Sequence, residues 1–161
     1  MHAFLTWMET SALGHAVRES SLWTYPIVNL AHVLGVATLF GSVLVLDLRL
    51  LGCWRQTSIA AITGAAVPVA TAGFLVAVCS GTGLLAANAT AYANNPLLLV
   101  KFPAIALGLV NVAVARRLPA WRAHAERALS SREERQLAVV GGISLACWVT
   151  AIAAGRLIAY W

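Results

Sequence analysis

A tyrosine, an asparagine and a histidine follow one another at helical spacing in the first long apolar stretch of the chain. Tyr25, Asn29 and His32 occupy positions i, i+4 and i+7, so a helix would place them on one stripe. Neutral imidazole binds iron, copper and zinc, which makes His32 a candidate haem or metal ligand with Tyr25 and Asn29 as cofactor-binding neighbours. The alternative is a histidine that hydrogen-bonds a neighbouring helix. Because lipid cannot satisfy polar groups, the stripe is expected to face the protein interior or a partner subunit.

Two cations, Lys101 and Arg156, lie a few residues below the predicted outer ends of two other apolar stretches. Cations at this depth can hold an anion such as a lipid phosphate, a quinone oxygen or the propionates of a haem. The alternative is that both side chains extend to the headgroups, as long basic side chains near helix ends do. Asn111 lies deeper in the same stretch as Lys101, and we expect it to hydrogen-bond a neighbouring helix.

The set of candidate ligands is too small for a conventional haem site. A haem b in a helix bundle usually has two axial histidines, and His32 is the only histidine within an apolar stretch. His15, a water molecule or the His32 of a second protomer would have to supply the other ligand. The apolar stretches contain no HExxH motif, carboxylate pair or Ser–His–Asp set, which argues against a hydrolase or a di-metal oxidase. We predict no catalytic residue, and the chain on its own is expected not to be an enzyme.

These residues are carried by four apolar stretches that take up most of the 161-residue chain, over approximately residues 22–46, 59–86, 97–115 and 137–158. An apolar helix of about 20 residues matches a hydrocarbon core of about 30 Å. With 60% hydrophobic and 11% charged residues, the composition excludes a soluble globular domain. We predict an all-α fold: an integral membrane four-helix antiparallel bundle over residues 21–161, preceded by a short amphipathic segment over residues 1–20 at the membrane interface.

Three finer features are expected within these elements. Gly14 is expected to interrupt the amphipathic N-terminal helix. Ala66, Ala70 and Gly73 recur at i, i+4 and i+7, a spacing that favours close contact with another helix. The charged residues 117–135 predict one exposed helix that is stabilised by ion pairs.

The net charge is +5, and the distribution of the basic residues along the chain indicates a membrane topology and not nucleic-acid binding. Arg49 and Arg55 flank the first connection between apolar stretches, the second connection has no charge, and the third carries a cluster of arginines: Arg116, Arg117, Arg122, Arg127, Arg132 and Arg135. By the positive-inside rule, the first and third connections are cytoplasmic and both termini lie on the periplasmic side.

An ordered set of motifs runs along nearly the whole chain: Val17-Arg18-Glu19-Ser20, Tyr25-Pro26, His32-x-x-Gly35, Gly41-Ser42, Asp47-Leu48-Arg49-Leu50-Leu51-Gly52, Asn95-Pro96 with Lys101, Asn111, and Gly155-Arg156-Leu157-Ile158-Ala159-Tyr160. The set resembles an uncharacterised family of bacterial four-span membrane proteins, and the resemblance implies a small protein of the inner membrane. Members of that family typically have Glu at the position of Asn29, and many have His near the position of Arg116. Both departures remove potential ligands from this chain.

Three functions are compatible with these features. The first is a non-catalytic subunit that packs within and stabilises a larger membrane complex of the energy-converting or redox kind. The second is a cytochrome-b-like electron-transfer subunit with His32 as an axial ligand and Lys101 or Arg156 near the haem propionates. The third is a small oligomeric transporter or channel. The expected partners are the lipid bilayer and other membrane subunits or further copies of this chain, and the candidate cofactors are haem b, a bound lipid or a quinone.

Overall fold

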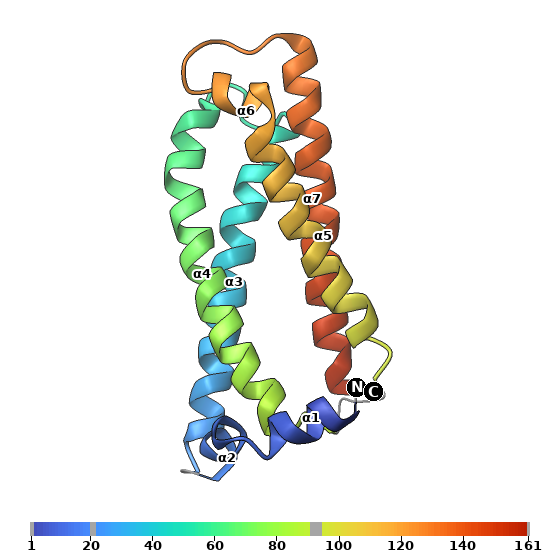
Figure 1. Ribbon diagram of the computed structural model, residues 1–161. Coiled ribbons are helices and arrows are strands. Elements are labelled where there is room, and N and C mark those ends of the chain that lie inside the picture. The colour runs from blue at the N-terminus through green and yellow to red at the C-terminus, as the bar shows by residue number, and fades with distance from the viewer. Residues whose placement is uncertain (1, 20–21, 91–94, 161) are drawn as a thin grey trace. The chain divides into compact units, whose positions relative to one another are not determined.

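The computed structural model describes residues 2–19, 22–90 and 95–160, and every regular element in this part of the chain is a helix (Figure 1). The helices are, in order, α1 (His2–Glu9), α2 (Ala12–Glu19), α3 (Thr24–Leu50), α4 (Ile59–Ala87), α5 (Leu98–Arg117), α6 (Pro119–Ala123) and α7 (Ser131–Leu157), followed by the 3-10 turn η1 (Ile158–Tyr160). The predicted all-α fold class is confirmed.

The four long helices, α3, α4, α5 and α7, coincide with the four predicted spans. They contain 27, 29, 20 and 27 residues, and their most apolar windows have mean hydropathies between 1.9 and 2.1. At about 1.5 Å per residue, a helix of about 20 residues covers the hydrocarbon core of a bilayer. The chain is therefore a multi-pass membrane protein whose apolar helices contact lipid.

The described chain forms two compact units, each made from two stretches: Met1–Leu39 with Thr71–Pro96, and Phe40–Ala70 with Leu97–Trp161. In the first unit, α3 and α4 touch at two glycines. A Cβ atom built on Gly35 would lie 2.8 Å from the backbone nitrogen of Ala77. A Cβ atom built on Gly73 would lie 2.5 Å from the backbone nitrogen of Leu39. The two backbones are therefore in direct contact, as the small-residue spacing predicted for Gly73.

In the second unit, residues that belong to or directly follow the four long helices pack in one apolar cluster. Leu137 of α7 and Ala120 of α6 are fully buried there, beside Leu50 at the end of α3. Ile59 at the start of α4 and Leu118 directly after α5 pack against these three residues. Each long helix thus has a residue within it or directly after it in this cluster.

The charged stretch after α5 is not the single exposed helix predicted from the sequence. Pro119 favours an extended conformation in the residue before it, and Leu118 accordingly has ψ 135°, which ends α5. The chain then passes through α6 and an irregular segment until Ser130 and Glu133 form a capping box that starts α7. The predicted ion pairing is confirmed at Arg127, whose guanidinium lies 2.6 Å from the Glu133 carboxylate. The hydrogen bond to Glu133 raises the pKa of Arg127 above its ordinary value.

Candidate functional site

His32, the predicted ligand, lies in the first unit on the side of α3 that meets α4. Its Nδ1 atom is 3.0 Å from the carbonyl oxygen of Ala77 and 3.2 Å from the hydroxyl oxygen of Ser80. A carbonyl only accepts hydrogen bonds, and the Ser80 hydroxyl donates its proton to the Val76 carbonyl at 2.5 Å. In the neutral ring, Nδ1 therefore carries the proton and Nε2 carries the lone pair. Gly81 makes room for the ring, because a Cβ atom there would lie 2.9 Å from Cε1 of His32.

This geometry agrees with both interpretations of His32. The hydrogen bond to a neighbouring helix, expected of a structural histidine, is present. The same bond, from Nδ1–H to a backbone carbonyl, also fixes the tautomer and ring orientation that histidine ligands of metals require. Ligation of haem or metal by Nε2 stays a prediction.

Tyr25 and Asn29 share a helix with His32, but both side chains are exposed, Tyr25 by 38%. The stripe therefore reaches α4 at His32, while Asn29 is exposed and Tyr25 is only partly covered by the described residues. On the adjoining side of α3, the apolar side chains of Ile27 and Leu30 are 61% and 57% exposed. The stripe was predicted to face either the protein interior or a partner subunit. Of its three residues, only His32 faces the interior of the first unit.

Lys101 and Arg156 belong to the second unit, so the structure describes them separately from the other three predicted residues. The Lys101 side chain is half-buried and follows α7 at Gly155, where a Cβ atom would lie 3.4 Å from its Nζ and 3.5 Å from its Cε. Arg156 is exposed and donates a 2.5 Å hydrogen bond to the Tyr160 hydroxyl. Its guanidinium also lies 4.7 Å from the centre of the Tyr160 ring, a cation–π contact. Anion binding by the two cations stays a prediction.

A buried carboxyl in the second unit, Asp47, was missed by the sequence reasoning, which ended the first apolar stretch at residue 46. α3 passes close to α7 at Gly141, where a Cβ atom would lie 3.2 Å from the backbone oxygen of Asp47. One turn further along α7, Ser144 hydrogen-bonds the Asp47 side chain, and the two residues are 6% and 3% exposed. The Oδ2 atom of Asp47 has no hydrogen-bond partner among the described residues. The signal that could have found it is periodicity, since Leu39, Asp47 and Leu50 lie on one face of α3 and are all buried.

Asn111 confirms the interhelical hydrogen bond predicted for it. Its Nδ2 atom donates to the Val140 carbonyl of α7 at 3.0 Å, and the residue is 8% exposed. Nearby, Trp148 of α7 is buried against α5 at Gly108, where a Cβ atom would lie 3.4 Å from the indole ring. Polar and aromatic contacts thus fix α5 against α7.

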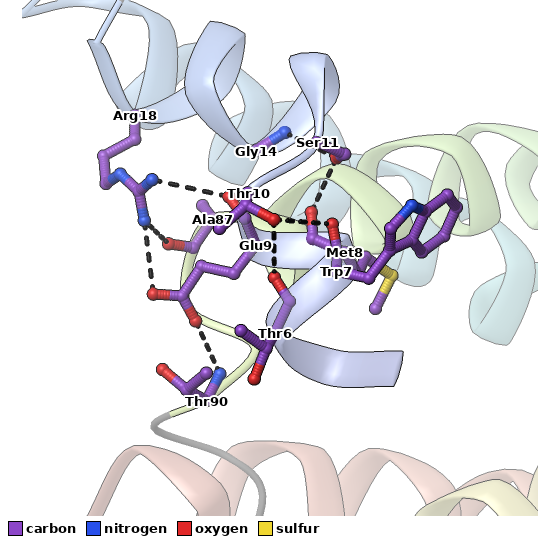
Figure 2. A network of polar contacts seen from close by, with 10 residues as sticks. All are labelled: Thr6, Trp7, Met8, Glu9, Thr10, Ser11, Gly14, Arg18, Ala87 and Thr90. Carbon is purple, nitrogen blue, oxygen red and sulfur yellow. Dashed lines mark hydrogen bonds and ion pairs between the residues drawn. The ribbon is translucent and has the colours of Figure 1, made fainter. Parts of the chain in front are cut away.

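A network of polar contacts holds the N-terminal helices against the end of α4, and Figure 2 shows it. Arg18 of α2 donates a 3.1 Å hydrogen bond to the Ala87 carbonyl and forms a 3.3 Å ion pair with Glu9. The second oxygen of Glu9 accepts a 2.6 Å hydrogen bond from the backbone of Thr90. Hydrogen bonds from Thr90, and the charge of Arg18, hold the pKa of the Glu9 carboxyl below its ordinary value. The network joins residues far apart in the sequence, and no motif predicted it.

The break between α1 and α2 lies at Thr10 and Ser11, so the predicted interruption at Gly14 is wrong. The Thr10 hydroxyl donates to the Thr6 carbonyl at 2.9 Å, and the Ser11 hydroxyl donates to a carbonyl at the end of α1 at 2.6 Å. These side chains satisfy backbone groups that the end of a helix leaves without partners. Gly14 instead lies inside α2, where a Cβ atom would be 3.0 Å from the carbonyl oxygen of Ala86 in α4. Its small size allows this contact between helices.

Comparison with known proteins identifies the family of the chain but no relative of known function. Within residues 2–19, 22–90 and 95–160, no group of three or more His, Cys, Asp or Glu side chains is arranged to hold a metal ion. No curated protein and no solved structure matches the chain. The sequence model of a family of unknown function, DUF6644, matches residues 4–161, which agrees with the resemblance to an uncharacterised family. Because the match covers nearly its whole length, the chain belongs to the DUF6644 family.

Proposed function

We propose that this protein is a non-catalytic subunit of the bacterial inner membrane that packs within and stabilises a larger complex of the energy-converting or redox kind. The observation that carries the proposal is the exposed amide of Asn29 on α3. The amide lies one turn before Val33, at the edge of a side of α3 that exposes apolar side chains: Ile27, Leu30, Val33 and Leu34, each by more than half. A face of this kind fits a partner helix, whose packing against the apolar side chains would be joined by a hydrogen bond to the amide.

Lipid alone does not account for this face. An asparagine amide that meets hydrocarbon loses its hydrogen bonds to water and gains none, at a cost of about 2 kcal/mol or more. Asn29 lies five residues into α3, about 8 Å along the helix at about 1.5 Å per residue. A partner helix that hydrogen-bonds the amide would offset part of this cost, by about 0.6 kcal/mol on average and up to about 1.7 kcal/mol where such bonds were measured in a membrane protein.

The distribution of arginines supports the orientation we propose for the subunit. Arg49 and Arg55 lie beside the connection between α3 and α4, and the remaining arginine cluster lies between the end of α5 and the first turns of α7. The positive-inside rule then places both connections in the cytoplasm and both termini on the periplasmic side.

Site-specific photo-crosslinking in native membranes tests the subunit proposal. A photoreactive residue at Asn29 is expected to give a protein adduct of one defined size. The matched control is Leu107, a 61% exposed position on α5, which is expected to give lipid adducts. The variant Asn29→Leu should lower the yield of the complex in mild detergent without lowering the amount of the chain in the membrane. If position 29 gives only lipid adducts and the isolated chain is stable alone, the proposal fails.

A second candidate, a haem-binding electron-transfer subunit, is favoured by one observation. The Nδ1–H of His32 is directed at the Ala77 carbonyl, which leaves the lone pair on Nε2, the atom that would ligate iron. A reduced-minus-oxidised spectrum of the purified protein should then show Soret and alpha bands that disappear in His32→Ala. A colourless preparation with no bound metal would rule this candidate out while leaving the subunit proposal standing.

A further inference from the structure

A hollow of about 240 Å³ lies in the second unit at its arginine-rich end. Its walls come from the end of α3, the loop between α3 and α4, and the first two turns of α7. Three arginines and one glutamate line it, Arg49, Arg55, Arg135 and Glu134, so these four side chains carry a net charge of +2 (three positive, one negative). A concave site with this surplus of positive charge is suited to an anion.

The three arginines reach the hollow from different elements. Arg49 donates from Nε to the Thr57 carbonyl at 2.7 Å and from Nη2 to the Arg55 carbonyl at 3.4 Å, which closes the loop around the hollow. The Arg55 guanidinium lies over Gly52, where a Cβ atom would be 3.2 Å from its Nη2. Gly52 has φ +104°, a conformation that residues with side chains rarely adopt. The glycine thus provides both the turn and the space for Arg55, while Arg135 reaches the hollow from α7.

Apart from Gly52 and Ser131, the rest of the lining is apolar. It consists of Leu50, Leu51, Ile59, Leu137 and Ala138. A free inorganic anion would gain nothing from these side chains. A phospholipid would place its phosphate among the guanidiniums and its glycerol and first methylenes on the leucines, at the end of the spans where headgroups lie.

We propose that this hollow, lined by Arg49, Arg55 and Arg135 together with apolar side chains, binds the headgroup of an anionic phospholipid. Guanidinium groups pair with phosphate oxygens through two parallel hydrogen bonds, so they hold a phosphodiester better than a diffuse positive surface does. The site is independent of the proposed subunit role, because it involves neither α3 near Asn29 nor His32.

The test compares two double variants that remove the same charge from the same end of the second unit. Arg55→Gln with Arg135→Gln changes the hollow, whereas Arg117→Gln with Arg122→Gln changes exposed arginines that do not line it. Arg49 is left intact because it also closes the loop. Native mass spectrometry of the full chain from nanodiscs that mix phosphatidylglycerol and phosphatidylcholine measures retention of each lipid.

The wild type and the control variant are expected to retain phosphatidylglycerol selectively, and the hollow variant should bind it about tenfold more weakly or worse. A third variant, Ala138→Phe, keeps every charge but fills part of the hollow from its apolar lining, and it should also lose the lipid. It keeps the test decisive should the arginine variant fail to fold. Equal losses in the two arginine variants would show that only the general charge matters and would overturn the proposal. So would displacement of the lipid by millimolar inorganic phosphate, because the site would then be one for a soluble anion.

Discussion

Adding one methyl group at Gly73 should separate α3 from α4. A Cβ atom there would lie 2.5 Å from the Leu39 nitrogen and 2.9 Å from the Gly35 oxygen, where ordinary contacts are 3.4–4 Å. Both neighbours are backbone atoms, so no rotamer change relieves the overlap and the helices must move apart by about 1 Å. Overpacking of this kind costs about 1–3 kcal/mol, and the better helix propensity of alanine returns up to about 1 kcal/mol. We therefore expect Gly73→Ala to lose about 1–2 kcal/mol, roughly a tenfold shift in the unfolding equilibrium.

The same helices provide matched controls for this substitution. Cβ atoms built on Gly64 in α4 and Gly41 in α3 would meet nothing within 4 Å. Gly64→Ala and Gly41→Ala should therefore leave stability unchanged or raise it by up to about 1 kcal/mol. Unfolding of the purified chain in mixed micelles, followed by circular dichroism as denaturing detergent is added, measures all three variants. If Gly73→Ala is as stable as Gly64→Ala, the direct contact of the two backbones is refuted.

Three other perturbations follow from the polar contacts. Ser144→Ala removes the hydrogen bond to the buried Asp47 and should lower the free energy of unfolding by about 1–3 kcal/mol in the same detergent titration. Asp47→Leu should lower it much less, because this variant leaves no buried carboxyl without a partner. The pKa of Glu9 is lowered on folding from an ordinary value of 4.5, so its contribution to stability is complete above that pH and is lost as the pH falls below it. Melting temperatures from about pH 6 to pH 3 should accordingly fall less steeply in Glu9→Gln than in the wild type. Ser130→Ala removes the cap of α7 and should cost about 1 kcal/mol by chemical denaturation, while Ser131→Ala next to it should cost little.

The membrane spans could be predicted because long apolar stretches have few alternatives in lipid. A backbone in hydrocarbon must satisfy its own hydrogen bonds, so the hydropathy of residues 59–86 predicts α4 without knowledge of its neighbours. The predicted role of Asn111 is correct for the same reason, since an amide at that depth must find a neighbouring helix. The prediction of one helix over residues 117–135 is wrong at Pro119, because the proline ring disfavours a helical conformation in the residue before it.

The contacts that could not be predicted depend on how distant segments meet. Asp47 is three residues from the end of α3, a position where a carboxylate normally reaches the headgroups. It is buried because Gly141 lets α7 approach, and Gly141 is far away in the sequence. The Glu9 contact likewise requires Thr90, which follows α4. Hydrophobic periodicity and composition do not tell which distant segments of the chain pack against each other.

The glycines of the spans indicate where polar side chains find partners. At Gly35, α3 approaches α4, and His32, three residues earlier on α3, bonds the Ala77 carbonyl of α4. At Gly141, α7 approaches α3, and one turn later Ser144 meets Asp47. A close approach excludes lipid and shortens the gap, so that short polar side chains can span it. In this protein, a polar residue within one helical turn of a glycine contact is therefore a better candidate for an interior site than a polar residue judged by its depth alone.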